Sequence, residues 1–203
     1  MELSKVTMIL RGYNVEQVRT VAEVLLHAKY VRNMEITLNT DNAYEIIRII
    51  SDEFQGKLNI GAGTVQTYDE LKKAVDAGAK FVLSPRQMTA DMLAYCKERG
   101  IVSVPGSFTP SEIGDQFAMG ADIVKVFPAN ELSLKYAKKV CEPMGDLKLM
   151  AVGGINRGNV REALDSGYKY VGTAGGLFPK DQILQMDKEK MLISLQEFEA
   201  ELD

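Results

Sequence analysis

Short apolar runs alternate with longer amphipathic stretches from one end of the chain to the other. Short apolar runs are typical of buried strands, whereas apolar residues that recur every three or four positions are typical of helices. The pattern therefore predicts eight strands and eight helices in strict alternation. The predicted strands are Val6–Leu10, Asn33–Thr37, Leu58–Ile60, Phe81–Ser84, Val102–Val104, Ile123–Val126, Lys148–Val152 and Tyr170–Gly172. The predicted helices are Val15–Leu26, Ala43–Phe54, Tyr68–Ala77, Ala90–Arg99, Pro110–Met119, Leu134–Glu142, Asn159–Ser166 and Lys188–Leu202.

Three of the predicted helix-to-strand junctions share one layout, in which a glycine ends the helix and a short polar step leads into the strand. These glycines are Gly78, Gly120 and Gly167. Glycine takes the left-handed conformation that terminates many helices, so the junctions indicate successive βα units. Eight such units in 203 residues predict an α/β fold, a single (β/α)8 TIM barrel that forms one catalytic domain over residues 1–203. The same alternation permits an open doubly wound sheet, but the strand count and the chain length favour the barrel.

A single lysine, Lys125, interrupts the apolar strand-like run Asp122–Ala129. In a strand that is covered on both faces, this lysine loses the water around its ammonium group, and desolvation lowers the pKa of an amine. An amine that is partly neutral near about pH 7 can attack a carbonyl carbon, which is the requirement for Schiff-base catalysis. The alternative interpretation is a lysine at a strand end whose amine reaches solvent.

Polar residues and glycines gather at the C-terminal ends of the predicted strands, which form the active-site face of a TIM barrel. Glu35 lies on one of these strands and shares a face with Thr37, because side chains alternate along a strand. A carboxylate that faces the barrel interior is costly unless it is paired or functional, so Glu35 is a candidate general acid/base. The alternative is an ion pair with Arg11 or Lys125. The other candidate binding residues at this rim are Arg11, Thr37, Asn39, Thr64, Pro85, Phe127, Gly153, Gly154, Thr173 and Gly175.

Three glycine-rich segments belong to the same rim. The segment Gly61–Thr64 suits close approach of the backbone to a ligand, or it forms only a tight turn before the next helix. The segments Gly153–Gly154 and Gly172–Gly176 follow predicted strands seven and eight, where barrels often bind phosphate through backbone N–H groups. Paired glycines are also common turn residues, so both interpretations stay open.

Composition is typical of a soluble globular protein. The chain is 46% hydrophobic and 26% charged, and its net charge of −4 offers no basic surface to nucleic acid or an anionic membrane. No apolar run approaches the ~18 residues of a membrane helix and no signal peptide is evident, so we expect a cytoplasmic protein. The only histidine, His27, and two separated cysteines, Cys96 and Cys141, argue against zinc or a histidine-based triad. A magnesium site built from carboxylates stays open.

Seven motifs that occur in order give the chain a resemblance to a known family. They are Ile9–Gly12, Met34–Asn39, Ile60–Val65, Leu83–Pro85, Val104–Gly106, Val124–Pro128 and Ala151–Ile155. No single motif is decisive, but together they cover nearly the whole chain and fall at the ends of the predicted strands. The sequence resembles the bacterial 2-keto-3-deoxy-6-phosphogluconate (KDPG) / 4-hydroxy-2-oxoglutarate (KHG) aldolase family.

The resemblance implies a metal-independent class I aldolase that needs no cofactor and forms a homotrimer. Such an enzyme cleaves a 2-keto-3-deoxy sugar acid, usually 6-phosphorylated, or 4-hydroxy-2-oxoglutarate into pyruvate and an aldehyde (glyceraldehyde 3-phosphate or glyoxylate). Carried over by position, Lys125 is the Schiff-base lysine and Glu35 is the general acid/base. The resemblance also assigns the pyruvate carboxylate to Arg11 and Thr64. It assigns the distal phosphate to Gly153, Gly154 and the loop Gly172–Gly176.

Two departures from the family pattern bear on the substrate. Asn39 stands where some gluconate-type members carry an arginine. The galactonate-type branch also has asparagine there, with the arginine on the first strand, and Val152 is similar to that branch. In the last loop, Ala174 and Gly175 replace a Gly-Ser pair that often helps to hold phosphate, which weakens the case for a phosphorylated substrate. Lys180 is a nearby cation that could compensate.

Two other functions fit the predicted fold, because one fold supports many activities. Another phosphate-binding barrel enzyme, similar to thiamin phosphate synthase or ribulose phosphate epimerase, would share the glycine-rich loops without needing a lysine on strand six. A non-catalytic barrel that binds a sugar acid is consistent with Ala174 and Gly175. The pair Lys125 and Glu35 discriminates the aldolase from another barrel enzyme. Ligand-induced stabilisation without release of pyruvate would favour the non-catalytic barrel.

Overall fold

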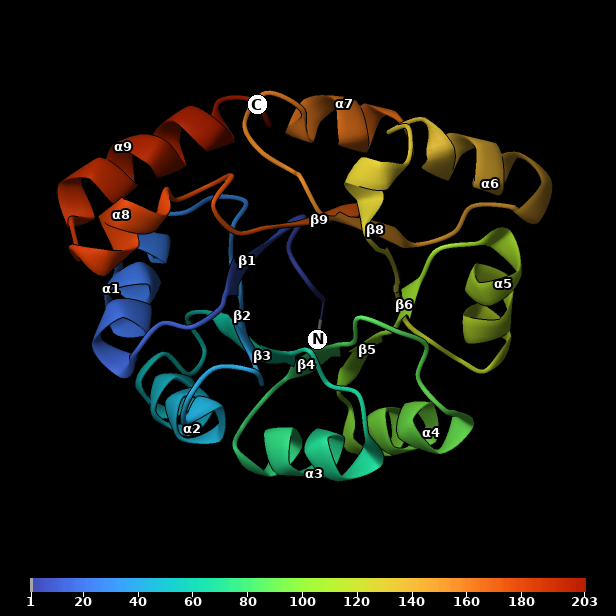
Figure 1. Cartoon of the computed structure of the whole chain (residues 1–203), viewed down its shortest axis with the longest axis horizontal. Coiled ribbons are helices and arrows are strands. Elements are labelled where there is room, and N and C mark those ends of the chain that lie inside the picture. The colour runs from blue at the N-terminus through green and yellow to red at the C-terminus, as the bar shows by residue number, and fades with distance from the viewer. Residues whose placement is uncertain (1) are drawn as a thin grey trace.

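The strands form one parallel sheet that curls into a ring, with the helices around its outside (Figure 1). We describe residues 2–203 of the chain from a computed structural model. Neighbours along the sheet follow the order β5-β4-β3-β2-β1-β9-β8-β7-β6. The strands are β1 (Val6–Leu10), β2 (Asn33–Thr37), β3 (Asn59–Gly63), β4 (Phe81–Leu83), β5 (Val102–Val104), β6 (Gly106–Ser107), β7 (Val124–Val126), β8 (Leu149–Val152) and β9 (Tyr170–Thr173).

The fifth barrel strand is split into β5 and β6 around Pro105, and this strand closes the ring. β5 pairs with β4, whereas β6 pairs with β7, so the two edges of the sheet belong to one continuous piece of chain. A proline has no N–H to donate to a strand ladder, which accounts for the break at this position. The predicted (β/α)8 TIM barrel is confirmed, and the open doubly wound sheet is wrong.

Side-chain caps set the beginning of several helices. At Asn14, Thr67 and Thr109, the cap side chain accepts a hydrogen bond from the backbone N–H three residues later, and that residue's side chain accepts one from the cap N–H. The predicted helices are all present. The helices are α1 (Val15–Leu25), α2 (Ala43–Glu53), α3 (Tyr68–Asp76), α4 (Ala90–Arg99), α5 (Pro110–Ala118), α6 (Tyr136–Met144), α7 (Val160–Asp165), α8 (Lys180–Leu184) and α9 (Lys188–Glu199).

Three details of the sequence-based prediction are wrong. The expected strict alternation misses α8 and the 3-10 helix η1 (Ala129–Glu131), which lie in the loops after β9 and β7. The split of the fifth strand was not predicted either. The third strand extends to Gly63, so the residues Gly61–Gly63, for which a turn was one interpretation, are part of the barrel wall.

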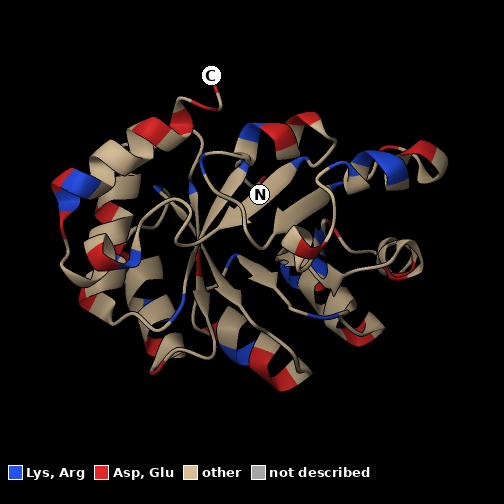
Figure 2. Cartoon of the chain, turned by 45° about the horizontal axis from the view of Figure 1, so that its top comes forward, with Lys and Arg blue, Asp and Glu red and all other residues tan. Residues whose placement is uncertain are grey.

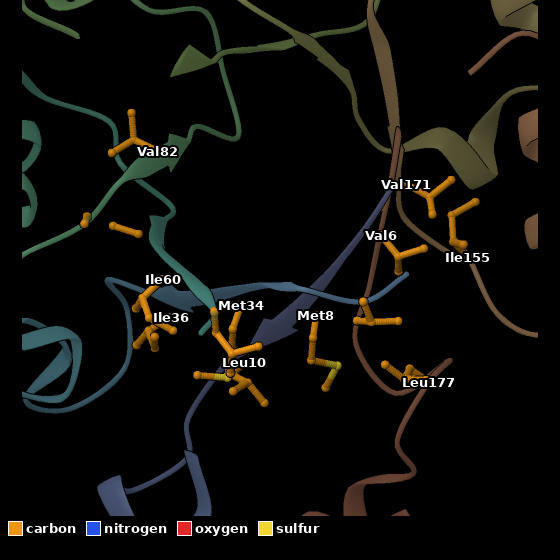
Figure 3. Packing of buried hydrophobic residues seen from close by; sticks show 14 of the residues in the cluster. Val6, Met8, Leu10, Met34, Ile36, Ile60, Val82, Ile155, Val171 and Leu177 are labelled. Carbon is orange, nitrogen blue, oxygen red and sulfur yellow. The ribbon is translucent and has the colours of Figure 1, made fainter. Parts of the chain in front are cut away.

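Alternate side chains of each strand face the helices and the barrel interior. On β1, Val6, Met8 and Leu10 belong to the large cluster that joins sheet and helices (Figure 3). A second cluster fills the interior, so the barrel is a packed core rather than a pore. Its buried members are Leu3, Ile9, Phe81, Leu83, Val104, Ile123, Met150 and Val152.

The N-terminal segment closes one end of the barrel and lies at the centre of the ring in Figure 1. Leu3 packs in the interior cluster. The fully buried Asn33 donates to the carbonyl oxygens of Ser4 and Val6, at 2.9 and 3.3 Å, and its Oδ1 accepts from the side-chain amide of Asn59 at 2.9 Å. Side chains fill this end of the barrel, and its buried polar groups are hydrogen-bonded. The open mouth is therefore the opposite end, where the strands have their C-termini.

Charged residues lie mainly on the helices and loops outside the sheet (Figure 2). Within residues 2–203, no helix combines the length and the apolar character that crossing a membrane would require.

Replacing Asn33 with alanine should destabilise the closed end of the barrel. The substitution removes the side-chain donor to the Ser4 carbonyl and the acceptor of the Asn59 amide, while the Val6 carbonyl keeps the Ser4 hydroxyl as a donor. An unsatisfied buried polar group costs about 1–3 kcal/mol. We expect a loss of this size in the free energy of unfolding, measured by urea denaturation. Gln55→Ala, at an exposed position, is the control, and an equal effect of the two substitutions would contradict the role of Asn33.

Candidate active site

β7 carries Lys125 into the barrel interior. Its neighbours Val124 and Val126 belong to the outer cluster, so the alternation of the strand turns Lys125 inward. Its side chain is only 5% exposed, and Nζ lies 4.8 Å from the centroid of the Phe127 ring. The predicted burial of Lys125 is confirmed, and the interpretation in which its amine reaches bulk solvent is wrong.

β2 carries Glu35 into the same interior between the outward-facing Met34 and Ile36. Glu35 is 2% exposed, and its Oε2 has no hydrogen-bond partner within residues 2–203. A buried polar atom without a partner is rare in native proteins and points to a functional role. Within the same residues, no ion pair joins Glu35 to Lys125 or Arg11, so the interpretation of Glu35 as half of a structural ion pair is wrong.

Burial shifts both ionisable groups toward their neutral forms. Desolvation raises the pKa of the Glu35 carboxyl, and the positive charges of Lys125 and Arg11 oppose this shift. Desolvation lowers the pKa of the Lys125 amine; the charge of Glu35 opposes the shift and Arg11 adds to it. Because desolvation is the largest cause for both groups, the amine loses its proton, and the carboxyl keeps its own, more readily than at the surface.

A cavity of about 540 Å³ opens at the C-terminal mouth of the barrel. Ile9, Phe127 and Val152 give it apolar walls, and Arg11 brings a positive charge to its edge. Phe127 borders both this cavity and the Lys125 amine, so the buried amine lies close to the open space although Lys125 does not itself line it. Six of the predicted site residues meet here: Arg11, Phe127, Gly153, Gly154, Thr173 and Gly175.

The loops after β8 and β9 form the glycine-rich side of the cavity. The backbone N–H groups of Ala174 and Gly175 donate no hydrogen bond within residues 2–203, and both residues are exposed. Thr173 Oγ1 donates to the carbonyl of Ile155 at 2.7 Å and thereby ties the two loops together. Free N–H groups in a fixed loop are suited to bind an anion.

Sequence analysis did not include four residues that line this cavity among its candidate site residues: Ile9, Val152, Ile155 and Asn156. The side-chain amides of Asn156 and Asn159 both donate to the carbonyl of Gly154, at 3.0 and 2.9 Å, and hold the turn after the paired glycines. The two asparagines follow Gly154 by two and five residues, and this local turn signal could have found Asn156.

Besides Lys125 and Glu35, four of the predicted binding residues lie outside the walls of the cavity: Thr37, Asn39, Thr64 and Pro85. The buried Thr37 hydroxyl lies 3.2 Å from the Thr40 hydroxyl, whose oxygen accepts from the N–H of Gly12 at 2.9 Å. Thr37 therefore helps to fix the loops after β1 and β2 against each other. Asn39 is exposed on the turn after β2.

Thr64 directly follows β3 in a left-handed conformation, with φ of 60°. This conformation is uncommon for a β-branched residue and costs about 1–3 kcal/mol. Backbone strain of this kind is concentrated at functional sites, and Thr64 lies at the mouth of the barrel, at the end of the strand next to that of Glu35. No group of three or more His, Cys, Asp and Glu residues that could hold a metal occurs within residues 2–203.

Comparison with known proteins agrees with this geometry. Residues 1–193 match the family described as KDPG and KHG aldolase. A probable 2-dehydro-3-deoxy-6-phosphogalactonate aldolase from Rhizobium meliloti (strain 1021) is 28% identical over 193 residues, which cover 95% of this chain and 90% of that protein. The 2-dehydro-3-deoxy-phosphogluconate aldolase of Dickeya dadantii (strain 3937) is 34% identical over 164 residues, 79% of this chain and 75% of that protein. The crystal structure of a KDPG aldolase from Legionella pneumophila, with pyruvate captured as a covalent carbinolamine, matches with a TM-score of 0.83 at 27% identity and covers 97% of this chain and 93% of its own.

Glu35→Gln should change how the stability of the protein depends on pH. Burial raises the folded-state pKa of Glu35 above its ordinary value of 4.5, so the folded protein keeps a proton that the unfolded chain has released. The stability of the wild type therefore falls as pH rises between these two pKa values, and the variant lacks this contribution. We expect the free energy of unfolding of the variant minus that of the wild type to grow by up to about 1.4 kcal/mol per pH unit in this window.

Urea unfolding at a series of pH values measures this difference. Glu98→Gln, on the exposed side of α4, controls for the loss of one carboxylate from the net charge. If the difference in the free energy of unfolding between Glu35→Gln and the wild type does not change with pH, the raised pKa of Glu35 is contradicted.

Proposed function

The chain belongs to the KDPG and KHG aldolase family, and from this membership we propose that Lys125 forms the Schiff base of a class I aldolase that cleaves 2-keto-3-deoxy sugar acids. The products are pyruvate and an aldehyde. The observation that carries the proposal is the Lys125 amine, which is buried in the barrel with its pKa lowered and shares the interior with the buried carboxyl of Glu35. The Legionella relative supports the covalent route, since it holds pyruvate as a carbinolamine.

The first half of the reaction forms the covalent intermediate. The neutral Nζ of Lys125 attacks C2 of the keto acid and gives a carbinolamine. The hydroxyl of the carbinolamine takes up a proton from the solvent and leaves as water, so that a protonated imine remains. The positive nitrogen withdraws electrons from C2, so the electron pair of the C3–C4 bond can move toward it. The lowered pKa of Lys125 is the property that this first attack requires.

The second half breaks the carbon–carbon bond. Ionised Glu35 takes the proton from the C4 hydroxyl, directly or through water, and C4 leaves as the aldehyde carbon. The C3–C4 electron pair becomes the C2–C3 double bond of an enamine, and the nitrogen becomes neutral. Glu35 then returns the proton to C3, and water adds to C2, which releases pyruvate and restores Lys125. The raised pKa of Glu35 suits a group that must both accept and return a proton.

Arg11 and Thr64 are our candidates to hold the pyruvate carboxylate. Arg11 lies at the edge of the cavity and acts electrostatically on both Lys125 and Glu35. Thr64 directly follows Gly63 on the strand beside that of Glu35. An anion held between them would lie near the buried pair, which orients C2 toward the amine.

The distal end of the substrate would lie in the glycine-rich part of the cavity. The free N–H groups of Ala174 and Gly175 support a 6-phosphorylated substrate. Lys180 begins α8 and does not line the cavity, so it does not replace the serine hydroxyl that the loop lacks. Cleavage of 4-hydroxy-2-oxoglutarate to glyoxylate and pyruvate is the shorter-substrate form of the same reaction. Pyruvate release from gluconate-type, galactonate-type, unphosphorylated and hydroxy-oxoglutarate substrates distinguishes these possibilities.

We further propose a cytoplasmic homotrimer. Three large apolar side chains are exposed around α5 and α6, namely Phe108, Met119 and Met144. The Tyr136 hydroxyl donates to the carbonyl of Phe108 at 2.7 Å and fixes this surface between the two helices. Association of copies would remove these side chains from water. The molar mass in solution, measured by light scattering, tests the trimer.

Borohydride added together with pyruvate should reduce the imine and leave a stable adduct on Lys125. We expect the adduct in the intact mass of the wild type and on the peptide that contains Lys125, and its loss in Lys125→Met. Lys148→Met, which removes an exposed lysine just before β8, is the matched control and should keep the adduct. Glu35→Gln should also keep it while turnover falls about 10²–10⁴-fold, because only proton transfer is impaired. A wild type without an adduct would exclude the Schiff-base mechanism.

Gly175→Ser should improve the use of phosphorylated substrates. A Cβ at this position meets no other atom within 4 Å, so the new hydroxyl has room beside the proposed phosphate. One added hydrogen bond to a charged group should raise kcat/KM for the phosphorylated substrate about tenfold, with little change for its unphosphorylated analogue. Gly175→Ala controls for the change in backbone freedom. An equal effect on both substrates would place the phosphate elsewhere.

A further inference from the structure

Gly63 lies directly against the carboxyl group of Glu35. Ile60 and Ala62 of β3 face the outer cluster, so Gly61 and Gly63 face the barrel interior. A Cβ placed on Gly63 would overlap Oε1 and Cδ of Glu35 and would lie 2.7 Å from its Cγ. The carboxyl of Glu35 therefore occupies the volume that a side chain at position 63 would fill.

The backbone at Gly63 does not itself require glycine. Its φ lies outside the left-handed region, unlike that of Thr64, the next residue. Gly63 is paired in parallel register with Thr37, and its carbonyl accepts from the N–H of Leu38 at 2.8 Å. Any residue could adopt this strand conformation, so the constraint at position 63 is the space taken by Glu35.

Gly61 provides a comparison on the same face of the same strand. A Cβ there would lie 2.5 to 2.6 Å from three ring atoms of Phe81. Phe81 is fully buried in the interior cluster, so its ring has little room to move. Gly61 thus makes space for an apolar core residue, whereas Gly63 makes space for an ionisable one.

We propose that Gly63 is a positioning residue for Glu35: the missing side chain lets the carboxyl lie flat against β3, at the place from which it transfers protons. This inference rests on the proposed function of Glu35. The fixed place also keeps the carboxyl out of a direct ion pair with Lys125. A carboxylate in contact with the amine would favour the charged ammonium and oppose its attack on a carbonyl.

The variant Gly63→Ala tests the proposal. The new methyl group meets the far end of a flexible side chain, so Glu35 can rotate away while the strand stays intact. We expect the exchange of the methyl hydrogens of pyruvate with deuterated water, followed by NMR, to slow about 10²-fold or more. Borohydride trapping of pyruvate on Lys125 should persist, because imine formation does not use the carboxyl as a proton donor to carbon.

A double-mutant cycle separates positioning from a general structural effect. In a Glu35→Ala background, Gly63→Ala should change the residual exchange rate less than about threefold, because the group that it displaces is gone. Full-sized slowing in this background, or unchanged exchange in Gly63→Ala alone, would overturn the proposal. If Gly63→Ala does not fold, folding of the double variant supports the overlap with Glu35, and its failure to fold overturns it.

Gly61→Ala is the matched control. It places the same methyl group on the same face of β3 but against the Phe81 ring. We expect it to lower the thermal unfolding midpoint more than Gly63→Ala does, and to slow exchange less. The opposite order of these two effects would overturn the assignment of Gly63.

The titration of Glu35 distinguishes this proposal from the aldolase proposal. Moving the carboxyl away from β3 into a more hydrated position should lower the pKa of Glu35 toward its ordinary value, as measured by carbon NMR of the labelled carboxyl. If the wild type forms no pyruvate adduct, the aldolase mechanism fails while this measurement still tests Gly63. An unchanged Glu35 titration in Gly63→Ala would overturn the positioning role alone.

Discussion

Desolvation of two ionisable groups inside a filled barrel is the constraint on which the site depends. Lys125 and Glu35 are both nearly inaccessible to water, and the remaining interior side chains are mostly apolar. Burying these groups costs free energy that the rest of the fold must offset. The same cost moves the pKa of the amine down and that of the carboxyl up. The proposed mechanism needs these two shifts, because it uses a neutral amine and a carboxyl group that can take up a proton and return it.

The two ends of the barrel differ in how well their polar groups are satisfied and in backbone strain. At the closed end, Asn33 satisfies backbone groups of the N-terminal segment, and Leu3 fills the interior. At the open end, Thr64 has a strained backbone conformation, and the Oε2 of Glu35 lacks a partner within residues 2–203. Satisfied hydrogen bonds stabilise the first end, whereas strain and unpaired polar atoms are concentrated at the end where ligands are expected.

Glycine has two different physical roles around this site. Gly153 and Gly154 have φ of 110° and 72°, so the turn after β8 depends on backbone conformations that other residues rarely adopt. Gly61 and Gly63 have ordinary strand conformations and instead make room for Phe81 and Glu35. Glycine thus shapes the barrel wall as well as its loops. At Gly63, the absence of a side chain lets the acidic side chain of Glu35 lie within a tightly packed interior.

The periodicity of the chain was sufficient to predict the barrel, and one lysine in an apolar strand was sufficient to predict a buried amine, because alternation and burial are local properties. The same pattern could not show that Pro105 splits the closing strand, since only the pairing of β5 with β4 and of β6 with β7 reveals it. Nor could it show that Gly61–Gly63 belong to a strand, because glycine is more typical of turns than of strands. Phe81 of β4 and Glu35 of β2 fill the space that side chains at Gly61 and Gly63 would take. These contacts between strands form only when the barrel folds. Tertiary packing likewise decided that Lys125 and Glu35 form no ion pair. The two residues lie on different strands, and the sequence does not specify the distance between their side chains across the barrel.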